Sequence, residues 1–380
     1  MPGEILIVAT EASADLHAAR VLEELRRLRP ALRAFGMGGP RLRDAGLECL
    51  HRAEEMSVMG FVEVLPKIPV ILRILRELTG AARERRPEVA LLVDSPDFNL
   101  RLARRLKQLG TKVVYYVSPS VWAWRRRRVK TIVRCVDRML CILPFEERFY
   151  DGTGVSARFV GHPLAERPLP RAPAAYRETL GLAPGRTTIA LLPGSRAAEV
   201  KRIFPSMLDA AERIRAAHPD AQFVVPVAPT LAVEALRPYL ARHAALDVKL
   251  APGATESAVG ASDVALVKSG TSVLEAALMM RPMVVVYRLS WLSYVIGRLF
   301  VRLAHFALVN LLAGRTVVPE LLQRQASPAR MAAELERLLG DGAARAEQLR
   351  GLEEVRASLG TPGAPRRVAE EIARTLDHDA

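Results

Sequence analysis

The stretch ILIVATEASADLHAARVLEELRRL, residues 5–28, contains the pattern that recurs along the chain. Its apolar run, Ile5–Ala9, is typical of a buried strand, and the amphipathic residues Asp15–Leu28 are typical of a helix. The same alternation continues with strand-like runs at Val89–Val93, Val113–Val117 and Met139–Leu143 and helical patterns at Phe98–Leu109 and Arg125–Val136. Because strands that alternate with helices form parallel sheets, the sequence predicts an α/β fold built on a doubly wound parallel sheet.

The alternation restarts in the second half, after a segment rich in proline. Residues Pro163–Arg186 contain five prolines and show neither the strand nor the helix period, which indicates a linker. Further strand-like runs follow at Thr188–Leu192, Phe223–Val227, Val264–Val267 and Met283–Tyr287, and the tail Pro328–Ala380 has a helical pattern. We predict one Rossmann-like domain over 1–165, a linker over 166–186 and a second Rossmann-like domain over 187–345 that faces the first across a cleft. C-terminal helices are expected over 346–380, where they could pack back on the first domain.

The composition is that of a globular protein with large cores, because 50% of the 380 residues are hydrophobic and 25% are charged. These values exclude a disordered, collagen-like or disulfide-scaffold chain. The three cysteines show no paired spacing and the first residues lack the features of a signal peptide, so we expect a cytoplasmic protein. No stretch approaches the ~20 apolar residues that span a bilayer. The net charge of +14 favours an anionic partner, which can be nucleic acid, a membrane surface or a phosphorylated substrate.

Open parallel sheets bind ligands beyond the carboxyl ends of their strands, so the residues that follow each strand are candidates for a site. Glu11, Ser13 and Asp15 follow the first strand. Ser13 or Asp15 could cap the helix, whose free N–H groups form a small anion site, and a plain capped turn is an equal alternative. Asp94 and Asp97 follow another buried strand. Asp97 fits the N-cap of the next helix, and it also fits a general base whose proton affinity Asp94 would shift.

Ser118 and Ser120 precede a segment, Trp122–Arg128, that holds two tryptophans and four consecutive arginines. Tryptophans beside arginines could stack on nucleic-acid bases or could bind phosphates at a lipid headgroup interface. A basic helix start with buried tryptophans is the structural alternative. Basic residues in the first turn of a helix oppose its dipole, and this favours an anionic partner.

Two loops of the phosphate-binding type lie in the second half. Arg196 ends the sequence LPGSR between a strand and a helix, where its guanidinium and backbone N–H groups would bind a phosphate. Ser269, Gly270 and Thr271 lie at another such helix start, and Glu275, one turn further, could accept hydrogen bonds from a ribose. Each loop alone can be a capped helix start, but two in one half favour a nucleotide. No P-loop, GxGxxG motif or zinc spacing occurs, so the sequence predicts no metal site.

The chain resembles the lipid-A-disaccharide synthase family, whose members are glycosyltransferases of the GT-B architecture. Nine segments keep the order of that family over nearly the whole chain: Glu11–Ser13 with Asp15, Gly36–Gly39, Met56–Glu63, Asp94–Asn99, Val117–Trp124, Val160–Leu164, Leu192–Arg196, Ser269–Thr271 with Glu275, and Asn310–Gly314 with Pro319 and Glu320. The chain departs from the family at Thr10 and Ala14, where glycine is usual, and at Lys268, where many members have a small residue.

The resemblance implies transfer of a sugar from UDP-2,3-diacylglucosamine to 2,3-diacylglucosamine 1-phosphate, with inversion by direct attack of the acceptor 6-hydroxyl. The products would be the β-1,6-linked lipid A disaccharide 1-phosphate and UDP. The same resemblance implies that no cofactor and no metal take part. Asp97 matches the family aspartate thought to act as the base. The donor would be bound in the second half by Arg196, Ser269, Gly270, Thr271, Glu275 and Asn310, and the acceptor in the first half near Glu11, Ser13, Asp15, Asp94, Ser118 and Ser120.

Because both substrates of that family are lipids, the resemblance implies peripheral contact with an anionic membrane surface, at the cytoplasmic face of the inner membrane. The apolar stretches Met56–Leu75 and Pro282–Gly314 are candidates for insertion, with ordinary core helices as the alternative. The oligomeric state stays open. Another UDP-sugar transferase or a UDP-sugar epimerase of the same architecture is the alternative function. A nucleic-acid binder would leave Asp94, Asp97 and both phosphate-type loops unexplained, so we expect no nucleic-acid partner.

Overall fold

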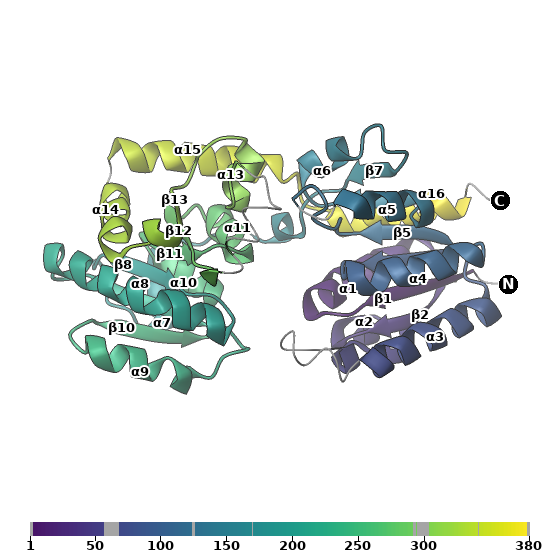
Figure 1. Cartoon of the computed structure of the whole chain (residues 1–380), viewed down its shortest axis with the longest axis horizontal. Coiled ribbons are helices and arrows are strands. Elements are labelled where there is room, and N and C mark those ends of the chain that lie inside the picture. Colours follow the sequence, from purple (N-terminus) through teal and green to yellow (C-terminus); the bar gives the residue numbers. More distant parts are fainter. Residues whose placement is uncertain are drawn as a thin grey trace. The chain divides into compact units, whose positions relative to one another are not determined.

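The computed structural model describes residues 3–56, 68–123, 126–168, 170–291, 294, 304–340 and 342–377. The chain divides into two compact units (Figure 1). The first unit contains Met1–Glu166 and Leu359–Ala380, and the second contains Arg167–Ser358. Each unit is built on one parallel sheet, as the alternation of strands and helices predicts.

The sheet of the first unit has seven strands in the order β3-β2-β1-β4-β5-β6-β7. Their bounds are β1 Glu4–Ala9, β2 Arg33–Gly38, β3 Glu48–Arg52, β4 Val89–Val93, β5 Lys112–Tyr116, β6 Arg138–Cys141 and β7 Ser156–Phe159. The helices are α1 Ala12–Leu28, α2 Pro40–Asp44, α3 Ile68–Arg85, α4 Pro96–Gln108, α5 Val129–Cys135, α6 Pro144–Phe149 and α16 Ala364–Asp377. Strand order reverses at β1 and β4, and ligands bind at such a point in open parallel sheets.

Both faces of this sheet are covered, because alternate residues of β1 enter two different cores. Ile5 and Ile7 pack with α1 and α16, whereas Leu6 and Val8 pack with α3, α4 and α5. A strand buried on both faces is a continuous apolar run, which is why β1 and β4 are recognisable in the sequence.

Helix α16 comes from the C-terminus and packs beside α1 in the first unit (Figure 1). Its apolar stripe, Val368, Ala369 and Ile372, is buried in the same core as α1. Glu166 accepts hydrogen bonds from the N–H groups of Gly363 and Ala364 at 2.7 and 2.8 Å, and so satisfies two donors at the start of this helix.

The sheet of the second unit has six parallel strands in the order β10-β9-β8-β11-β12-β13. Their bounds are β8 Thr188–Leu192, β9 Gln222–Val227, β10 Val248–Pro252, β11 Val264–Lys268, β12 Met283–Tyr287 and β13 Glu320–Leu322. The helices are α7 Pro173–Leu180, α8 Ala197–Ala217, α9 Arg237–Leu240, α10 Thr255–Ala261, α11 Thr271–Leu278, α13 Leu308–Ala313, α14 Pro328–Leu338 and α15 Ala343–Ser358. Its main core lies between the sheet and the helices α8 and α14.

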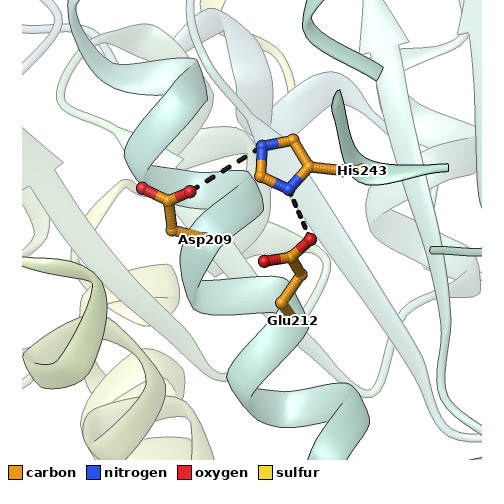
Figure 2. Close-up of side chains that lie close together, drawn as sticks. All are labelled: Asp209, Glu212 and His243. Atoms are coloured by element: carbon orange, nitrogen blue, oxygen red, sulfur yellow. Dashed lines mark hydrogen bonds and ion pairs between the residues drawn. The ribbon is translucent and has the colours of Figure 1, made fainter. Parts of the chain in front are cut away.

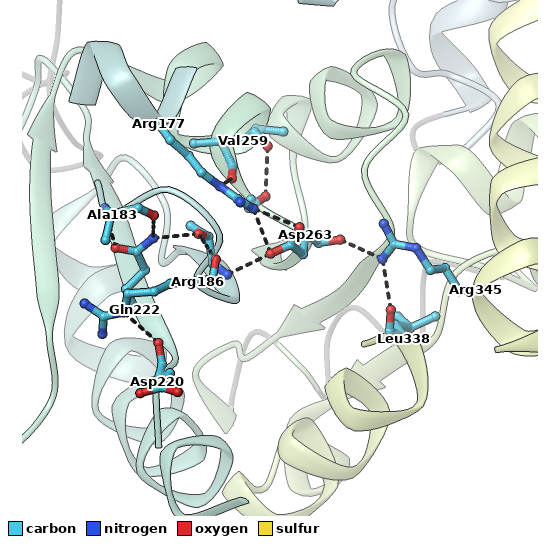
Figure 3. A network of polar contacts seen from close by, with 12 residues as sticks. Arg177, Ala183, Arg186, Asp220, Gln222, Val259, Asp263, Leu338 and Arg345 are labelled. Atoms are coloured by element: carbon cyan, nitrogen blue, oxygen red, sulfur yellow. Dashed lines mark hydrogen bonds and ion pairs between the residues drawn. The ribbon is translucent and has the colours of Figure 1, made fainter. Parts of the chain in front are cut away.

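The unit boundaries differ from those that the sequence suggested. The segment 166–186 was expected to be a linker, but it contains α7, whose Tyr176 is buried against Gly260 of α10. Arg177 of α7 pairs with Asp263, at the centre of a polar network that joins α7 to the sheet (Figure 3). Helix α15 was expected among the C-terminal helices outside the second domain, but it belongs to the second unit, where Gln348 bonds both backbone groups of Met283.

Candidate functional site

The first candidate region lies at the carboxyl end of β4, where the backbone takes an uncommon conformation. Asp94 and Ser95 have φ values of +53° and +46°, which are in the left-handed region that non-glycine residues seldom adopt. The side-chain amide of Asn99 donates to the carbonyl of Asp94 at 2.8 Å and to that of Val93 at 3.0 Å. These bonds stabilise the turn, and strained turns of this kind cluster at functional sites.

Asp97 lies in the first turn of α4, so the N-cap position predicted for it is wrong. The helix begins at Pro96, and Ser95 is its N-cap residue. The Asp97 side chain is 77% exposed and forms an ion pair with the guanidinium of Arg128, which comes from the short 3-10 helix Arg126–Arg128. A carboxylate that is open to solvent and beside a cation can reach a substrate hydroxyl, so the geometry leaves the role of a base available to Asp97.

A cavity of about 280 Å³ lies beside this pair and brings together several predicted acceptor-side residues. Among its lining residues are Asp94, Ser118, Ser120, Arg128 and Glu146. Burial raises the pKa of Asp94 above its ordinary value. Two carboxyl groups, two hydroxyl-bearing side chains and one cation therefore line a single hollow at the ends of β4 and β5.

Glu146 is a member of this group that the sequence did not reveal. Only 2% of it is exposed, and its carboxylate accepts hydrogen bonds from the Trp122 indole at 3.1 Å and from the Leu143 N–H at 3.2 Å. Burial raises its pKa to about 7, and the two hydrogen bonds oppose that rise. Trp122 is thereby attached to α6. Trp124 and Arg125, which belong to the segment predicted to contact nucleic-acid bases or lipid phosphates, lie outside the described residues.

Replacing Glu146 by glutamine is expected to reduce the pH dependence of stability. An unfolded glutamate has a pKa of about 4.3, whereas burial raises that of folded Glu146 to about 7. The stability that this group contributes is therefore fully present below about pH 4 and is lost as the pH rises toward 7. Between pH 5 and pH 8 the unchanged protein should lose roughly 2–3 kcal/mol through Glu146, a loss that Glu146→Gln should not show. Urea unfolding at both pH values measures this, with Glu147→Gln as the neighbouring control; equal losses in all three proteins would contradict it.

Glu11, Ser13 and Asp15 do not line this cavity. The prediction that Ser13 or Asp15 caps α1 is wrong, because the N-cap residue is Glu11 and it makes no side-chain cap bond. The buried Asp15 carboxylate instead accepts N–H bonds of 2.7, 2.9 and 3.1 Å from Gly39, Arg41 and Leu42. Asp15 therefore caps α2, whereas Ser13 is exposed on the first turn of α1.

The second candidate region is a cavity of about 360 Å³ at the carboxyl ends of β8 and β11. Arg196, Gly270 and Thr271 line it, so the structure brings together three of the residues predicted to bind the donor. Arg196 is the N-cap residue of α8 and Thr271 is the first residue of α11. Two helix N-termini therefore open toward this hollow, and their free N–H groups favour an anion.

The other three predicted donor residues do not line this cavity. The Ser269 hydroxyl donates to the Phe306 carbonyl at 3.4 Å, and Glu275 pairs with Arg167 at 2.9 Å. Asn310 is fully buried, and its amide makes hydrogen bonds to the backbone of Val317 and Val318 and to Glu320. A direct contact of Asn310 with a ligand would require these bonds to be exchanged.

A further group, Asp209, Glu212 and His243, has the side chains that metal ions prefer, although the sequence predicted no metal site. Figure 2 shows the His243 ring between the two carboxylates of α8. One ring nitrogen lies 2.7 Å from Glu212 and the other 3.7 Å from Asp209. Because the two nitrogens face different carboxylates, the arrangement fits a bridge that holds the segment Ala241–His243 against α8 better than a converging ligand set.

These features define a class of protein. Two parallel-sheet α/β units form the GT-B glycosyltransferase fold, as solved structures of that class indicate. CalG4, the calicheamicin glycosyltransferase, has a TM-score of 0.60 with this chain at 18% identity and covers 100% of both chains. MurG of Acinetobacter baumannii has a TM-score of 0.59 at 13% identity, over 98% of this chain and 100% of its own. A UDP-GlcNAc 2-epimerase of Neisseria meningitidis shares the fold, with a TM-score of 0.61 at 11% identity.

The chain belongs to the lipid-A-disaccharide synthetase family, whose sequence model matches residues 5–367. The lipid-A-disaccharide synthase of Anaeromyxobacter dehalogenans strain 2CP-C is 72% identical over 97% of this chain and 96% of its own length. That of Myxococcus xanthus is 54% identical over 99% of this chain and 98% of its own. The predicted family, GT-B fold and hexosyltransferase activity are thereby confirmed, and the protein has a glycosyltransferase role in lipid A synthesis.

Proposed function

We propose that this chain joins UDP-2,3-diacylglucosamine to 2,3-diacylglucosamine 1-phosphate with inversion at the anomeric carbon. The acceptor O6 attacks C1 of the donor sugar while the bond between C1 and the diphosphate oxygen breaks. The acceptor hydroxyl proton passes to a carboxylate, and UDP leaves with the bonding electron pair. The products are the β-1,6-linked disaccharide 1-phosphate and UDP, so atoms and charge balance.

The observation that carries the proposal is the cavity of the second unit. Because the chain belongs to this family, we interpret that cavity as the donor site. Backbone N–H groups at two helix starts, the Arg196 guanidinium and the Lys268 ammonium are the donors that a diphosphate requires. They would also stabilise the negative charge that develops on UDP as it leaves, so this chemistry needs no further group. We assign the donor to this cavity, with Ser269, Glu275 and Asn310 supporting its walls.

We assign the acceptor to the cavity of the first unit, with Asp97 as the base. Its carboxylate is accessible, and it pairs with Arg128, which lines the cavity together with Asp94. Ser118 and Ser120 would bind sugar hydroxyl groups, and Arg128 is a cation within reach of an acceptor phosphate. Glu11, Ser13 and Asp15 would act through the loops that they support.

The experiment is the reaction itself. The purified chain receives UDP-2,3-diacylglucosamine and 2,3-diacylglucosamine 1-phosphate in detergent, and UDP is quantified while mass spectrometry identifies the lipid. UDP together with a tetra-acyl disaccharide 1-phosphate supports the proposal. UDP without disaccharide, or conversion of a soluble UDP-sugar with no acceptor, would instead favour the alternative transferase or epimerase.

We further propose that the protein acts as a peripheral protein on the cytoplasmic face of the inner membrane. Among the described residues no helix is long and apolar enough to cross a bilayer. Two apolar side chains near the start of α3, Ile68 and Leu72, lie one turn apart and are 42% and 36% exposed. Trp291 is 74% exposed in the second unit. These residues belong to the two stretches predicted to insert, of which residues 57–67, 292–293 and 295–303 lie outside the described residues.

The double substitution Ile68→Asp and Leu72→Asp is expected to weaken vesicle binding about tenfold, because it removes apolar area and adds charges that an anionic surface repels. Cosedimentation with phosphatidylethanolamine–phosphatidylglycerol vesicles measures the change. Leu28→Asp is the matched control, since Leu28 on α1 is also 42% exposed. An equal loss for the control, or none for the double variant, would contradict docking through α3.

A further inference from the structure

A carboxylate lies in the middle of the proposed diphosphate site. Glu199, on the first turn of α8, lines the cavity with its side chain 16% exposed. It accepts from the Lys268 ammonium at 2.8 Å and from the Ser195 backbone N–H at 3.3 Å, and it lies 3.5 Å from the Arg196 guanidinium. These three donors are the kind that bind phosphate oxygens, and in this structure one internal carboxylate contacts all of them.

The backbone is shaped for this approach. Gly194 has a φ of +110°, and a Cβ atom there would come within 2.5 Å of the Glu199 carboxylate. The turn before α8 therefore takes a conformation available to glycine, and the missing side chain leaves room for the carboxylate. Lys268, at the end of β11, also lies 5.3 Å from the Tyr287 ring centroid, so the lysine is held between an aromatic ring and Glu199.

We propose that the Glu199 carboxylate is an internal counter-ion that occupies the place of the donor diphosphate, and that the diphosphate displaces it from Lys268 and from the Ser195 N–H. This inference rests on the proposed function, because it concerns the same donor site. Lys268 then becomes a diphosphate ligand. An internal competitor keeps the cations paired in the empty enzyme, and it lowers the affinity for UDP, which helps this product to leave.

A different role for Glu199 predicts the opposite sign. An acid near the start of a helix interacts favourably with the helix dipole, and Glu199 could serve only to order the Gly194–Arg196 turn. In that case a neutral side chain would loosen the turn and weaken nucleotide binding. Glutamine separates the two roles, because it keeps the size and one acceptor oxygen but removes the charge.

Calorimetric titration of the full-length protein with UDP tests the proposal. Glu199→Gln is expected to tighten UDP binding about tenfold, because the like charge beside the diphosphate is lost. Lys268→Met should weaken UDP binding, and by a larger factor in the Glu199→Gln background, where the ammonium is no longer neutralised. Uridine, which lacks the diphosphate, should bind the parent and Glu199→Gln equally. Glu353→Gln, an exposed site on α15, removes the same charge outside the cavity and should leave UDP affinity unchanged.

The outcomes separate this inference from the proposed function. If the parent binds UDP and the Glu199→Gln substitution leaves that affinity unchanged or weakens it, the inference alone would be overturned. Equal tightening for uridine would also overturn it, since the effect would then not concern the diphosphate. If neither the parent nor any variant binds UDP, although all of them show the thermal unfolding of a folded protein, both the inference and the proposed donor site would be overturned.

Discussion

Asp97→Asn lowers kcat about a thousandfold and leaves UDP affinity unchanged, if Asp97 takes the proton of the acceptor hydroxyl. General bases contribute roughly 10²–10⁴-fold to rate, and an asparagine cannot accept that proton. The amide oxygen can still accept from Arg128, so the local structure should persist. UDP affinity is expected to be preserved because the donor cavity is lined by residues of the second unit alone. The measurement pairs the UDP-release assay with UDP titration.

Asp377→Asn is the matched control for this experiment. Asp377 also lies in the first unit, is exposed and pairs with an arginine, Arg29, but it is not among the residues that line the acceptor cavity. It should retain full activity. A folded Asp97→Asn protein that keeps more than a tenth of the parent rate, or that loses UDP binding as well, would contradict the assigned role. Loss of turnover in Asp94→Asn alone would assign the base to Asp94.

The strands that the sequence predicted to the residue are those buried on both faces. The bounds of β4, β8 and β12 coincide with their predicted apolar runs, Val89–Val93, Thr188–Leu192 and Met283–Tyr287. Edge strands gave no such signal. In β3, Glu48–Arg52, exposed positions alternate with half-buried ones, as expected where one side of a strand meets solvent. Edge strands β7, β10 and β13 were missed as well.

Strand β2 was missed for a different reason, because it lies inside the sheet but contains two glycines. Gly36 has a φ of +140°, and a Cβ there would come within 2.2 Å of the Ile7 carbonyl oxygen. The close approach of β1 therefore requires a residue that lowers the strand signal in the sequence. The helix α7 was also missed. Pro173 is its first residue, a position where proline is favoured, whereas the group of prolines in this segment suggested a linker.

The candidate site was predictable where its residues directly follow strands. Asp94, Ser118, Arg196 and Thr271 line cavities because the carboxyl ends of parallel strands meet at one edge of each sheet. Partners that lie far apart in the sequence gave no local signal. Asp15 bonds residues 24 to 27 positions away, and Glu199 bonds Lys268, 69 positions away.

A large loss of stability in the second unit is expected when Asp263 is replaced, because its carboxylate joins elements that are distant in the sequence. Its two oxygens accept from the Arg177 guanidinium at 2.9 and 2.8 Å, and one of them also accepts from the buried Thr188 N–H at 2.8 Å. Arg345 donates to the Asp263 carbonyl and to that of Leu338 (Figure 3). This network attaches α7, α14 and α15 to the strands β8 and β11.

Asp263→Ala should destabilise the second unit by roughly 3 kcal/mol, because it leaves a buried N–H without an acceptor and a largely buried guanidinium without its partner. For a unit of this size that lowers Tm by about 6–12 °C. Asp263→Asn should lose less, since its amide oxygen can still accept from Thr188.

Asp247→Ala is the control: Asp247 is 55% exposed and pairs with Arg186, so its loss should change stability by less than about 1 kcal/mol. Calorimetric unfolding of the full chain resolves these differences. Equal shifts for Asp263→Ala and Asp247→Ala would mean that α7 is held by the packing of Tyr176 rather than by this carboxylate.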